Sequence, residues 1–327
     1  MNYGKTEVSR KLRRISSKTE KLTSRMIFLF VKLILVAVLL MAAFAASLGY
    51  GALKGIIDSA PEIDVASIEP SGYATMVYDR EGNLTETLVK SGANRLEATY
   101  EELPQCLIDA FVAIEDSRFW SHKGIDIRSI LRAAVGVITG ESAGGGSTLT
   151  QQLIKNNIFE GGNENTFGEK LERKIQEQYL AVQLEKIMDK KIILKNYLNT
   201  INLGNNTLGV KAAALRYFNK DVSDLTLSEA TVIAGITQAP TRYNPLTENG
   251  RKNNEEKRRV ILQYMYEQGL IDKEAQEEAL ADDVYSRITN VNLTAQENES
   301  PYTYFTDELI TQVMEALQEA LGYTETQ

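Results

Sequence analysis

The feature that most constrains the fold is an apolar run of about 23 residues near the amino terminus, from Met26 to Leu48, which only Lys32 interrupts. At about 1.5 Å per residue, a helix of this length crosses the hydrocarbon core of a bilayer, and Lys32 can place its ammonium at the near interface. Small residues from Ala43 to Ser47 also fit a cleaved signal peptide. Because the run exceeds the roughly 7–15 apolar residues of a signal sequence, we expect a membrane anchor.

A basic segment precedes this run. Residues 1–25 carry eight Lys or Arg against two Glu, a net charge of about +6, and the rest carries about −14 because the whole chain carries −8. A basic tail can bind nucleic acid, but beside an apolar span it is typical of the cytoplasmic flank of a membrane protein. We therefore expect a cytoplasmic tail at 1–25, a single span at 26–48, an outer domain beyond it and no nucleic-acid partner.

The counts of cysteine and histidine exclude several kinds of site. Cys106 is the only cysteine and His122 the only histidine, so the chain has neither an intrachain disulfide nor a zinc site with two His ligands. A Ser-His or Cys-His nucleophile would have to use His122 itself. With 43% apolar residues over 327 positions the chain can bury a core, and the remaining enzymatic options use carboxylates and cations.

The outer region changes from strand to helix periodicity. Alternating residues at 74–79 and 84–89, separated by a Gly-containing segment at 80–83, predict a β-hairpin. Helical spacing follows from Pro104, with Asp126 and Ser147 as expected N-caps of two helices. Further helices are expected at about 169–189, 190–199, 229–236, twice within 254–281, and at 304–321. The sequence thus predicts an anchored, mainly α-helical outer domain.

The run from 115 to 124 concentrates scarce residues. It reads Glu-Asp-Ser-Arg-Phe-Trp-Ser-His-Lys-Gly and holds two adjacent carboxylates, the only Trp and the only His. A carboxylate among aromatic and basic neighbours can be tuned for proton transfer. A helix that ends in charge and a glycine explains the same residues, so these ten positions alone leave both interpretations open.

A glycine-rich loop at 144–146 leads into a second cluster. In the helix after it, Gln152, Lys155 and Asn156 are spaced i, i+3, i+4 and share one face. Backbone N–H groups at the start of a helix suit an anionic or sugar ligand, although no Gly-Lys-Ser/Thr follows the glycines as in a phosphate loop. An ordinary capped amphipathic helix would show the same spacing.

A third cluster, Arg173-Lys174-Ile-Gln-Glu177, places one carboxylate beside two cations on a single helical turn. Solvated ion pairs of little energetic value would give this pattern as well. Two later blocks, 197–218 and 227–245, contain small residues and Gly/Asn turns and are interpreted as scaffold.

Taken in order, these motifs resemble the peptidoglycan glycosyltransferase family, the polymerase domain of class A penicillin-binding proteins and of monofunctional glycosyltransferases. The matching patterns are Glu-Asp-x-x-Phe-x-x-His-x-Gly at 115–124, Gly-Gly-Ser-Thr-Leu-Thr-Gln-Gln-Leu-x-Lys-Asn at 145–156, Arg-Lys-x-x-Glu at 173–177 and the two later blocks. The resemblance covers about residues 74–282. It implies a mainly α, lysozyme-like fold with a larger lobe and a smaller membrane-facing jaw. Residues 204–209 depart from the family, because they lack its aromatic residue and its Gly-x-Gly.

The resemblance also implies a reaction, the polymerisation of lipid II into β-1,4 glycan with inversion and release of undecaprenyl pyrophosphate. Glu115 would be the general base, Glu177 a second essential carboxylate, and Lys155, Arg173 and Lys174 the cations that hold the pyrophosphate. The substrate-binding residues it implies are Asp116, Phe119, His122, Ser147, Thr148, Gln152, Lys155, Asn156, Arg173 and Lys174. No cofactor is obligatory, and a divalent cation, Mg²⁺ or Mn²⁺, bound with the pyrophosphate near Glu177 is compatible with the family.

The expected organisation is a basic tail at 1–25, an anchor at 26–48, a juxtamembrane segment with the hairpin at 49–100, the glycosyltransferase domain at 101–282 and a linker at 283–327. That linker would lead toward a transpeptidase domain, although no Ser-x-x-Lys or Lys-Thr-Gly occurs in this chain for peptide crosslinking. The expected location is the bacterial cell membrane, with the catalytic domain extracellular or periplasmic. Expected partners are lipid II, the growing strand, the membrane and proteins of cell-wall synthesis or division.

Two alternatives stay open at this stage. A lysozyme-like lytic enzyme also uses one catalytic Glu but cleaves polymer and needs no pyrophosphate clamp. An inactive, membrane-anchored glycan-binding scaffold would bind ligand without forming polymer.

Overall fold

The computed structural model describes residues 4–70, 72–73, 75–81, 84–88, 95–140, 145–159, 161–162, 164–291 and 304–322. The chain divides into two compact units, Met1–Pro61 and Glu62–Gln327.

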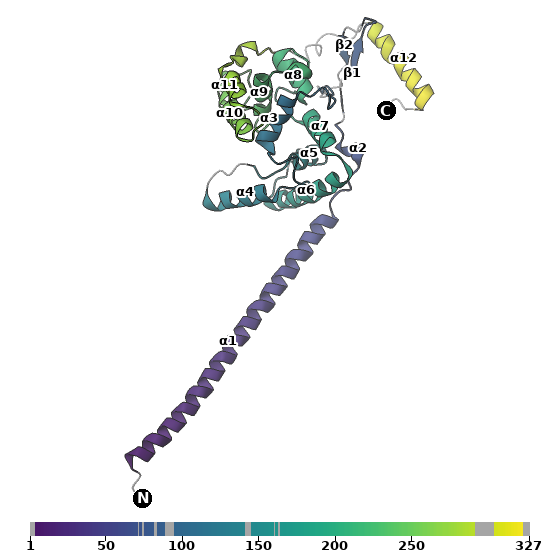
Figure 1. Ribbon diagram of the computed structural model, residues 1–327. Coiled ribbons are helices and arrows are strands. Elements are labelled where there is room, and N and C mark those ends of the chain that lie inside the picture. The colour runs from purple at the N-terminus through teal and green to yellow at the C-terminus, as the bar shows by residue number, and fades with distance from the viewer. Residues whose placement is uncertain are drawn as a thin grey trace. The chain divides into compact units, whose positions relative to one another are not determined.

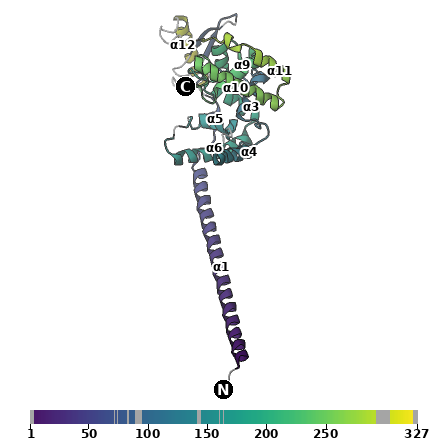
Figure 2. The same cartoon turned by 90° about the vertical axis from the view of Figure 1, so that its left-hand side faces the viewer.

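The first unit is a single long helix, α1 (Lys5–Asp58), drawn as one continuous rod in both views (Figure 1, Figure 2). Its segment Arg25–Asp58 is long and apolar enough to cross a membrane by length and composition. The apolar run predicted at 26–48 lies within it, and the basic tail from Lys5 onward continues the same helix. The expected apolar helix is confirmed.

The second unit begins with α2 (Val65–Ile68) and a two-stranded antiparallel sheet of β1 (Thr75–Tyr78) and β2 (Leu84–Leu88). Val77 is paired with Glu86, and the register shifts between Val77 and Tyr78. Positions 74, 82, 83 and 89 of the expected hairpin lie outside the described residues.

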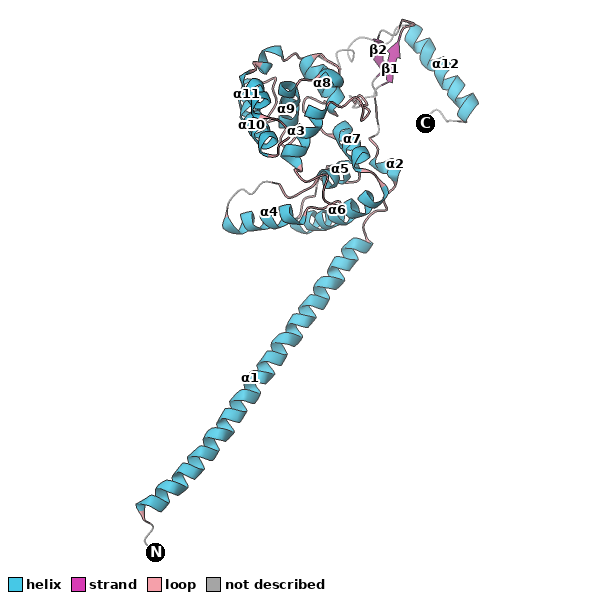
Figure 3. Ribbon diagram, in the orientation of Figure 1, coloured by secondary structure: helices cyan, strands magenta, loops and turns pink. Residues whose placement is uncertain are grey.

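The rest of this unit is helical, which confirms the predicted mainly α class (Figure 3). Its helices are α3 (Gln105–Glu115), α4 (Ile127–Thr139), α5 (Leu149–Asn157), α6 (Phe167–Ile187), α7 (Lys190–Thr200), α8 (Val210–Phe218), α9 (Leu227–Ile236), α10 (Glu248–Glu267), α11 (Lys273–Ala281) and α12 (Tyr304–Leu321). Two short 3₁₀ turns, Val222–Asp224 and Val284–Arg287, follow α8 and α11.

Helix packing forms two groups that meet at the site described below. In one group α9, with residues 228–236 all buried, contacts α3, α8, α10 and α11. In the other, α5 contacts α6 and α7. Because α9 is mostly apolar and is buried on all sides, it can only be stable inside such a group of helices.

Helix caps explain where several elements begin. Asp126 caps α4 as predicted, accepting from the N–H groups of Arg128 and Ser129, and Gly140 ends that helix in the left-handed conformation. The prediction that Ser147 caps the next helix was wrong. The cap is Thr148, whose hydroxyl accepts from Gln151 N at 3.2 Å while the Gln151 side chain accepts from Thr148 N at 2.8 Å. This reciprocal pair satisfies two backbone donors, which a cap at Ser147 would not.

Candidate active site

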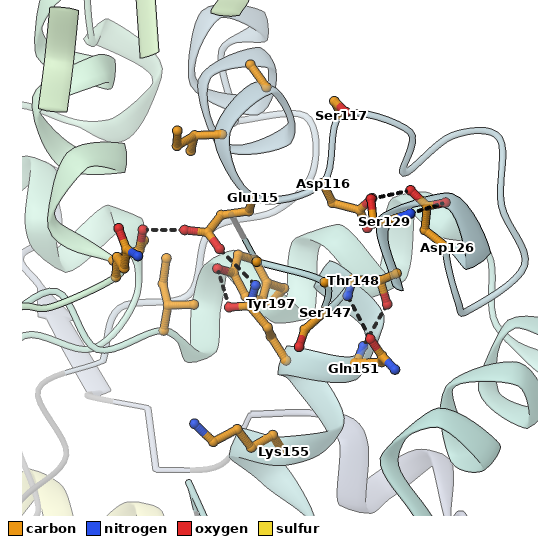
Figure 4. Close-up of a pocket in the computed structure, with 18 of the residues that line it drawn as sticks. Glu115, Asp116, Ser117, Asp126, Ser129, Ser147, Thr148, Gln151, Lys155 and Tyr197 are labelled. Atoms are coloured by element: carbon orange, nitrogen blue, oxygen red, sulfur yellow. Dashed lines mark hydrogen bonds between the residues drawn. The ribbon is translucent and has the colours of Figure 1, made fainter. Parts of the chain in front are cut away.

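One pocket of about 1200 Å³ brings most of the predicted residues together (Figure 4). Its wall combines residues from α3, α5, α6, α7 and α10 with those that follow α9. Among the predicted residues, the wall includes Glu115, Asp116, Ser147, Thr148, Gln152, Lys155, Asn156, Arg173, Lys174 and Glu177. Phe119 is fully buried and His122 nearly so, and neither is part of the wall.

Glu115 is the last residue of α3, and its carboxylate projects into the pocket (Figure 4). One oxygen, Oε1, accepts from the hydroxyl of Thr237 at 2.8 Å, and Oε2 accepts from Gln152 Nε2 at 2.8 Å. The Tyr197 hydroxyl donates to Gln152 Oε1 at 3.3 Å, which orients the amide. Gln152, expected to bind substrate, therefore directly contacts the carboxylate of the expected base.

Asp116 is buried behind Glu115 and bonded within the protein. It accepts from the backbone N–H of Leu149 at 3.0 Å, at the start of α5, and lies 2.8 Å from His122 Nε2. The other imidazole nitrogen lies 3.4 Å from Lys190 Nζ, and Lys190 donates to Glu185 at 2.8 Å. These partners occupy Asp116, which therefore positions the loop at 115–124. The hydrogen-bond partners of the Glu115 carboxylate, Thr237 and Gln152, themselves line the pocket.

The cations lie at another part of the same wall. Glu177 is fully buried, and both Arg173 and Lys174 donate to its carboxylate. Lys174 also donates to Ser147 Oγ at 2.8 Å, and Arg173 Nε lies 2.7 Å from Glu164. A buried carboxylate is stable here because two cations and their hydrogen bonds compensate its desolvation.

Lys155 lines this region from α5 (Figure 4). Within the part of the chain that the structure describes, no carboxylate lies within ion-pair distance of its ammonium. An anionic group that enters the pocket could bind Lys155 without displacing a carboxylate, whereas Arg173 and Lys174 are already paired. Thr148 also has a structural role, since its hydroxyl donates to the carbonyl of Gly124 at 2.6 Å and caps α5.

The surroundings of Glu177 do not fit a divalent cation held by the protein. Both of its carboxylate oxygens already accept from cationic side chains. Among the described residues, no group of three His, Cys, Asp or Glu side chains converges on a point where an ion could bind. These side chains alone therefore do not complete a ligand set, and Mg²⁺ or Mn²⁺ near Glu177, with substrate phosphates and water as further ligands, stays a prediction.

Among the pocket residues that sequence reasoning did not single out are Thr237 and Lys257. Thr237 follows α9 in a block that we interpreted as scaffold, and Lys257 lies on α10. Burial lowers the pKa of Lys257, and the nearby negative charge of Glu115 opposes that shift. Its ammonium donates to Gln238 Oε1 at 3.0 Å. The only sequence signal was the polar pair Thr237-Gln238 at the end of an otherwise apolar helix.

The segment that departs from the resembled family, 204–209, still forms a tight loop. Gly204, Asn205 and Asn206 all have positive φ, and asparagine is one of the few side-chain-bearing residues that adopts this conformation readily. Asn205 Nδ2 donates to the hydroxyl of Tyr217 at 3.3 Å and to Asn244 Oδ1 at 3.2 Å. These hydrogen bonds of the Asn205 side chain hold the loop in place.

Comparison with known proteins agrees with the motifs. The family profile described as "Transglycosylase" matches residues 81–266. Penicillin-binding protein 1A of Clostridium perfringens (strain 13 / Type A) is 38% identical over 306 residues, which are 90% of this chain and 44% of that protein. Penicillin-binding protein 1A of Aquifex aeolicus is 43% identical over 208 residues, covering 63% of this chain and 27% of that protein.

The crystal structure of penicillin-binding protein 1A from Haemophilus influenzae aligns over 78% of this chain and 25% of that one, at 23% identity and a TM-score of 0.36. The chain spans less than half the length of the curated relatives it matches.

Proposed function

The chain belongs to the transglycosylase family, and from that premise we propose that its outer domain is a peptidoglycan glycosyltransferase that polymerises lipid II. One observation supports this most strongly. A single pocket contains a carboxylate, Glu115, held by two hydrogen-bond donors, and a cationic wall formed by Lys155, Arg173 and Lys174. Glycosyl transfer from a pyrophosphate needs both a base for the acceptor and positive charge for the leaving group.

In the proposed reaction Glu115 removes the proton from the 4-hydroxyl of the acceptor GlcNAc. The oxygen then forms a bond to C1 of the donor MurNAc, and the bond between C1 and the phosphate oxygen breaks with its electron pair leaving on the pyrophosphate. Attack from the face opposite the leaving group inverts the α-linked donor to a β-1,4 product. The proton stays on Glu115 until it is lost to solvent.

The leaving undecaprenyl pyrophosphate would meet Lys155 first, because that ammonium has no ion-pair partner among the described carboxylates. Arg173 and Lys174 would add charge-assisted hydrogen bonds, and Glu177 would hold both cations at the wall. A divalent cation, if one takes part, would come with the substrate, since the side chains around Glu177 do not form its ligand set.

The same proposal places the protein at the bacterial cell membrane as a single-pass protein. The apolar segment of α1 supports the anchor, and the basic residues 5–25 support a cytoplasmic amino terminus, which leaves the catalytic domain outside. The enzyme would then bind its polyprenyl-linked substrate at the membrane surface.

The test is polymerisation of lipid II by the full chain in detergent. We expect glycan polymer and released undecaprenyl pyrophosphate, and a loss of about 10²- to 10⁴-fold in rate for Glu115→Gln, the usual contribution of a general base. Asp109→Asn is the matched control, because Asp109 is also a carboxylate of α3 but lies outside the pocket wall.

Three results would contradict the proposal. An unchanged rate for Glu115→Gln would remove the base assignment. Cleavage of purified cell wall without polymerisation would favour a lytic enzyme, and binding of lipid II without any polymer would favour a scaffold.

A further inference from the structure

Thr237 contacts two acceptors with one hydroxyl. It is the C-cap residue of α9, and its Oγ1 lies 2.8 Å from Glu115 Oε1 and 2.9 Å from the carbonyl oxygen of Ala234. A hydroxyl has a single proton and can donate to only one of them at a time. The Ala234 carbonyl can only accept, whereas Glu115 can donate when it carries a proton. The direction of the hydrogen bond between Thr237 and Glu115 therefore depends on whether Glu115 is protonated.

The other oxygen of Glu115, Oε2, can only accept in its hydrogen bond. Oε2 accepts from Gln152 Nε2, an amide nitrogen that can only donate. Tyr197 fixes the orientation of the Gln152 amide by donating to Gln152 Oε1. Burial raises the pKa of Tyr197 well above its usual value, and the charges of Glu115 and Asp116 raise it further, so the phenol stays protonated and donates. A stable neutral Glu115 therefore carries its proton on Oε1, opposite Thr237.

From this geometry we propose that Thr237 is a positioning residue for Glu115 whose hydrogen bond reverses during the reaction. With Glu115 ionised, the Thr237 hydroxyl donates to Oε1. After Glu115 takes the acceptor proton, its O–H donates to Thr237 Oγ1, and the Thr237 proton turns to the carbonyl of Ala234. The proposal rests on the proposed function, because the proton comes from the acceptor hydroxyl.

The end of α9 lowers the free-energy cost of reversing the hydrogen bond between Thr237 and Glu115. The last carbonyls of a helix lack donors within the helix, so the Ala234 carbonyl is available to the hydroxyl near the end of α9. Only the hydroxyl proton moves, by rotation about one bond, and each of the two states contains one bond between Glu115 and Thr237. The carboxyl group thus keeps its position in both protonation states.

Other charged and titratable groups face the same pocket and would remain in any variant of Thr237. They are Asp116 with His122 behind it, Asp126 and Arg132 at α4, Tyr197 on α7, Lys155 on α5, Arg173, Lys174 and Glu177 on α6, and Lys257, Tyr264 and Glu267 on α10. The charge of Glu115 acts on Lys257, which lines the pocket from α10 rather than from α9. A change seen on removing the hydroxyl alone is therefore assigned to Thr237.

The experiment compares Thr237→Val, which removes the hydroxyl at nearly constant volume, with Thr237→Ser, which keeps it. In the full chain with lipid II, we expect Thr237→Val to lower kcat about tenfold with little change in KM, since hydrogen bonds to charged groups contribute that much or more. The acid limb of the pH–rate profile should move to higher pH by about one unit, because the carboxylate has lost a donor. Thr237→Ser should restore both.

A readout without substrate separates this proposal from the proposed function. Isotope-edited infrared titration of ¹³C-Glu-labelled full chain, with Glu115→Gln to assign the band, should show protonation of Glu115 at higher pH in Thr237→Val but not in Thr237→Ser. If Thr237→Val does not fold by circular dichroism, Thr237→Ala takes its place.

An unchanged titration in the hydroxyl-free variant, or equal shifts in the Val and Ser variants, would overturn the role of Thr237. Absence of polymer with the wild-type chain would instead count against the proposed function, and the titration would still decide the role of Thr237.

Discussion

Replacing Gly124 with alanine should destabilise the second unit, Glu62–Gln327, through steric crowding at one backbone position. Gly124 ends the run at 115–124 with φ of +89°, and an added Cβ would lie 2.4 Å from the carbonyl oxygen of Ala181 and 2.5 Å from its carbon. Those atoms belong to the backbone of α6 and cannot rotate away. The Gly124 carbonyl also accepts the Thr148 hydroxyl at 2.6 Å, so its displacement would disturb the cap of α5.

Two effects add up at this position. A residue with a Cβ in the left-handed conformation costs about 1–2 kcal/mol. Crowding against fixed neighbours costs about 1–3 kcal/mol more. We therefore expect Gly124→Ala to lower the free energy of unfolding by about 2–5 kcal/mol, a large fraction of the stability of a typical domain.

Gly140→Ala is the matched control, because Gly140 has φ of +75° but no atom within 4 Å of an added Cβ. It should show the conformational cost alone. Urea unfolding followed by circular dichroism, and by the fluorescence of the single Trp120 in the same loop, measures both variants. Free energies of unfolding for Gly124→Ala and Gly140→Ala that agree within about 0.5 kcal/mol would refute the crowding argument.

Two further predictions concern charge. Lys155→Ala should raise the KM for lipid II about tenfold or more, because a charge-assisted contact to phosphate is lost. Lys123 is an exposed cation outside the pocket wall, so Lys123→Ala should leave the KM unchanged. Equal KM values for the two variants would contradict the role of Lys155. Burial disfavours the charged form of Asp126, but hydrogen bonds from Arg118 and Ser129 outweigh it and lower its pKa to about 2. Its contribution to stability is then complete above about pH 4 and lost as pH falls toward 2. Urea midpoints between pH 5 and pH 2.5 should fall more steeply than in Asp126→Asn, which keeps an N-cap, and parallel curves would contradict this.

Local rules explain what could be predicted before the structure. The length of the apolar run at 26–48 is sufficient for a helical anchor whatever packs elsewhere. Asp126 caps α4 because a short acceptor side chain before a helical stripe meets the N–H groups that follow it. The pairing of Glu177 with Arg173 and Lys174 follows from positions three and four apart on one helix.

Local rules also failed in identifiable ways. Ser147 and Thr148 are both suitable N-cap residues. Thr148 caps α5 because Gln151, three residues after it, completes the reciprocal hydrogen bond. On α4, Ile127 and Leu131 belong to an apolar stripe, yet both side chains are more than 60% exposed. Periodicity shows that a helix has an apolar face but not which surface covers it.

The sequence alone thus predicted the long apolar helix and the helical class, and it singled out Glu115 and the cations as candidates, because span length, helical spacing and motif order are properties of neighbouring residues. Only the tertiary structure decided what surrounds the carboxylate of Glu115. Thr237 lies 122 positions further along the chain, and Gln152 comes from yet another helix. A hydrogen bond requires atoms within about 3 Å, so the packing of α3 against α9 and the position of α5 select these partners, and no spacing in the sequence encodes them.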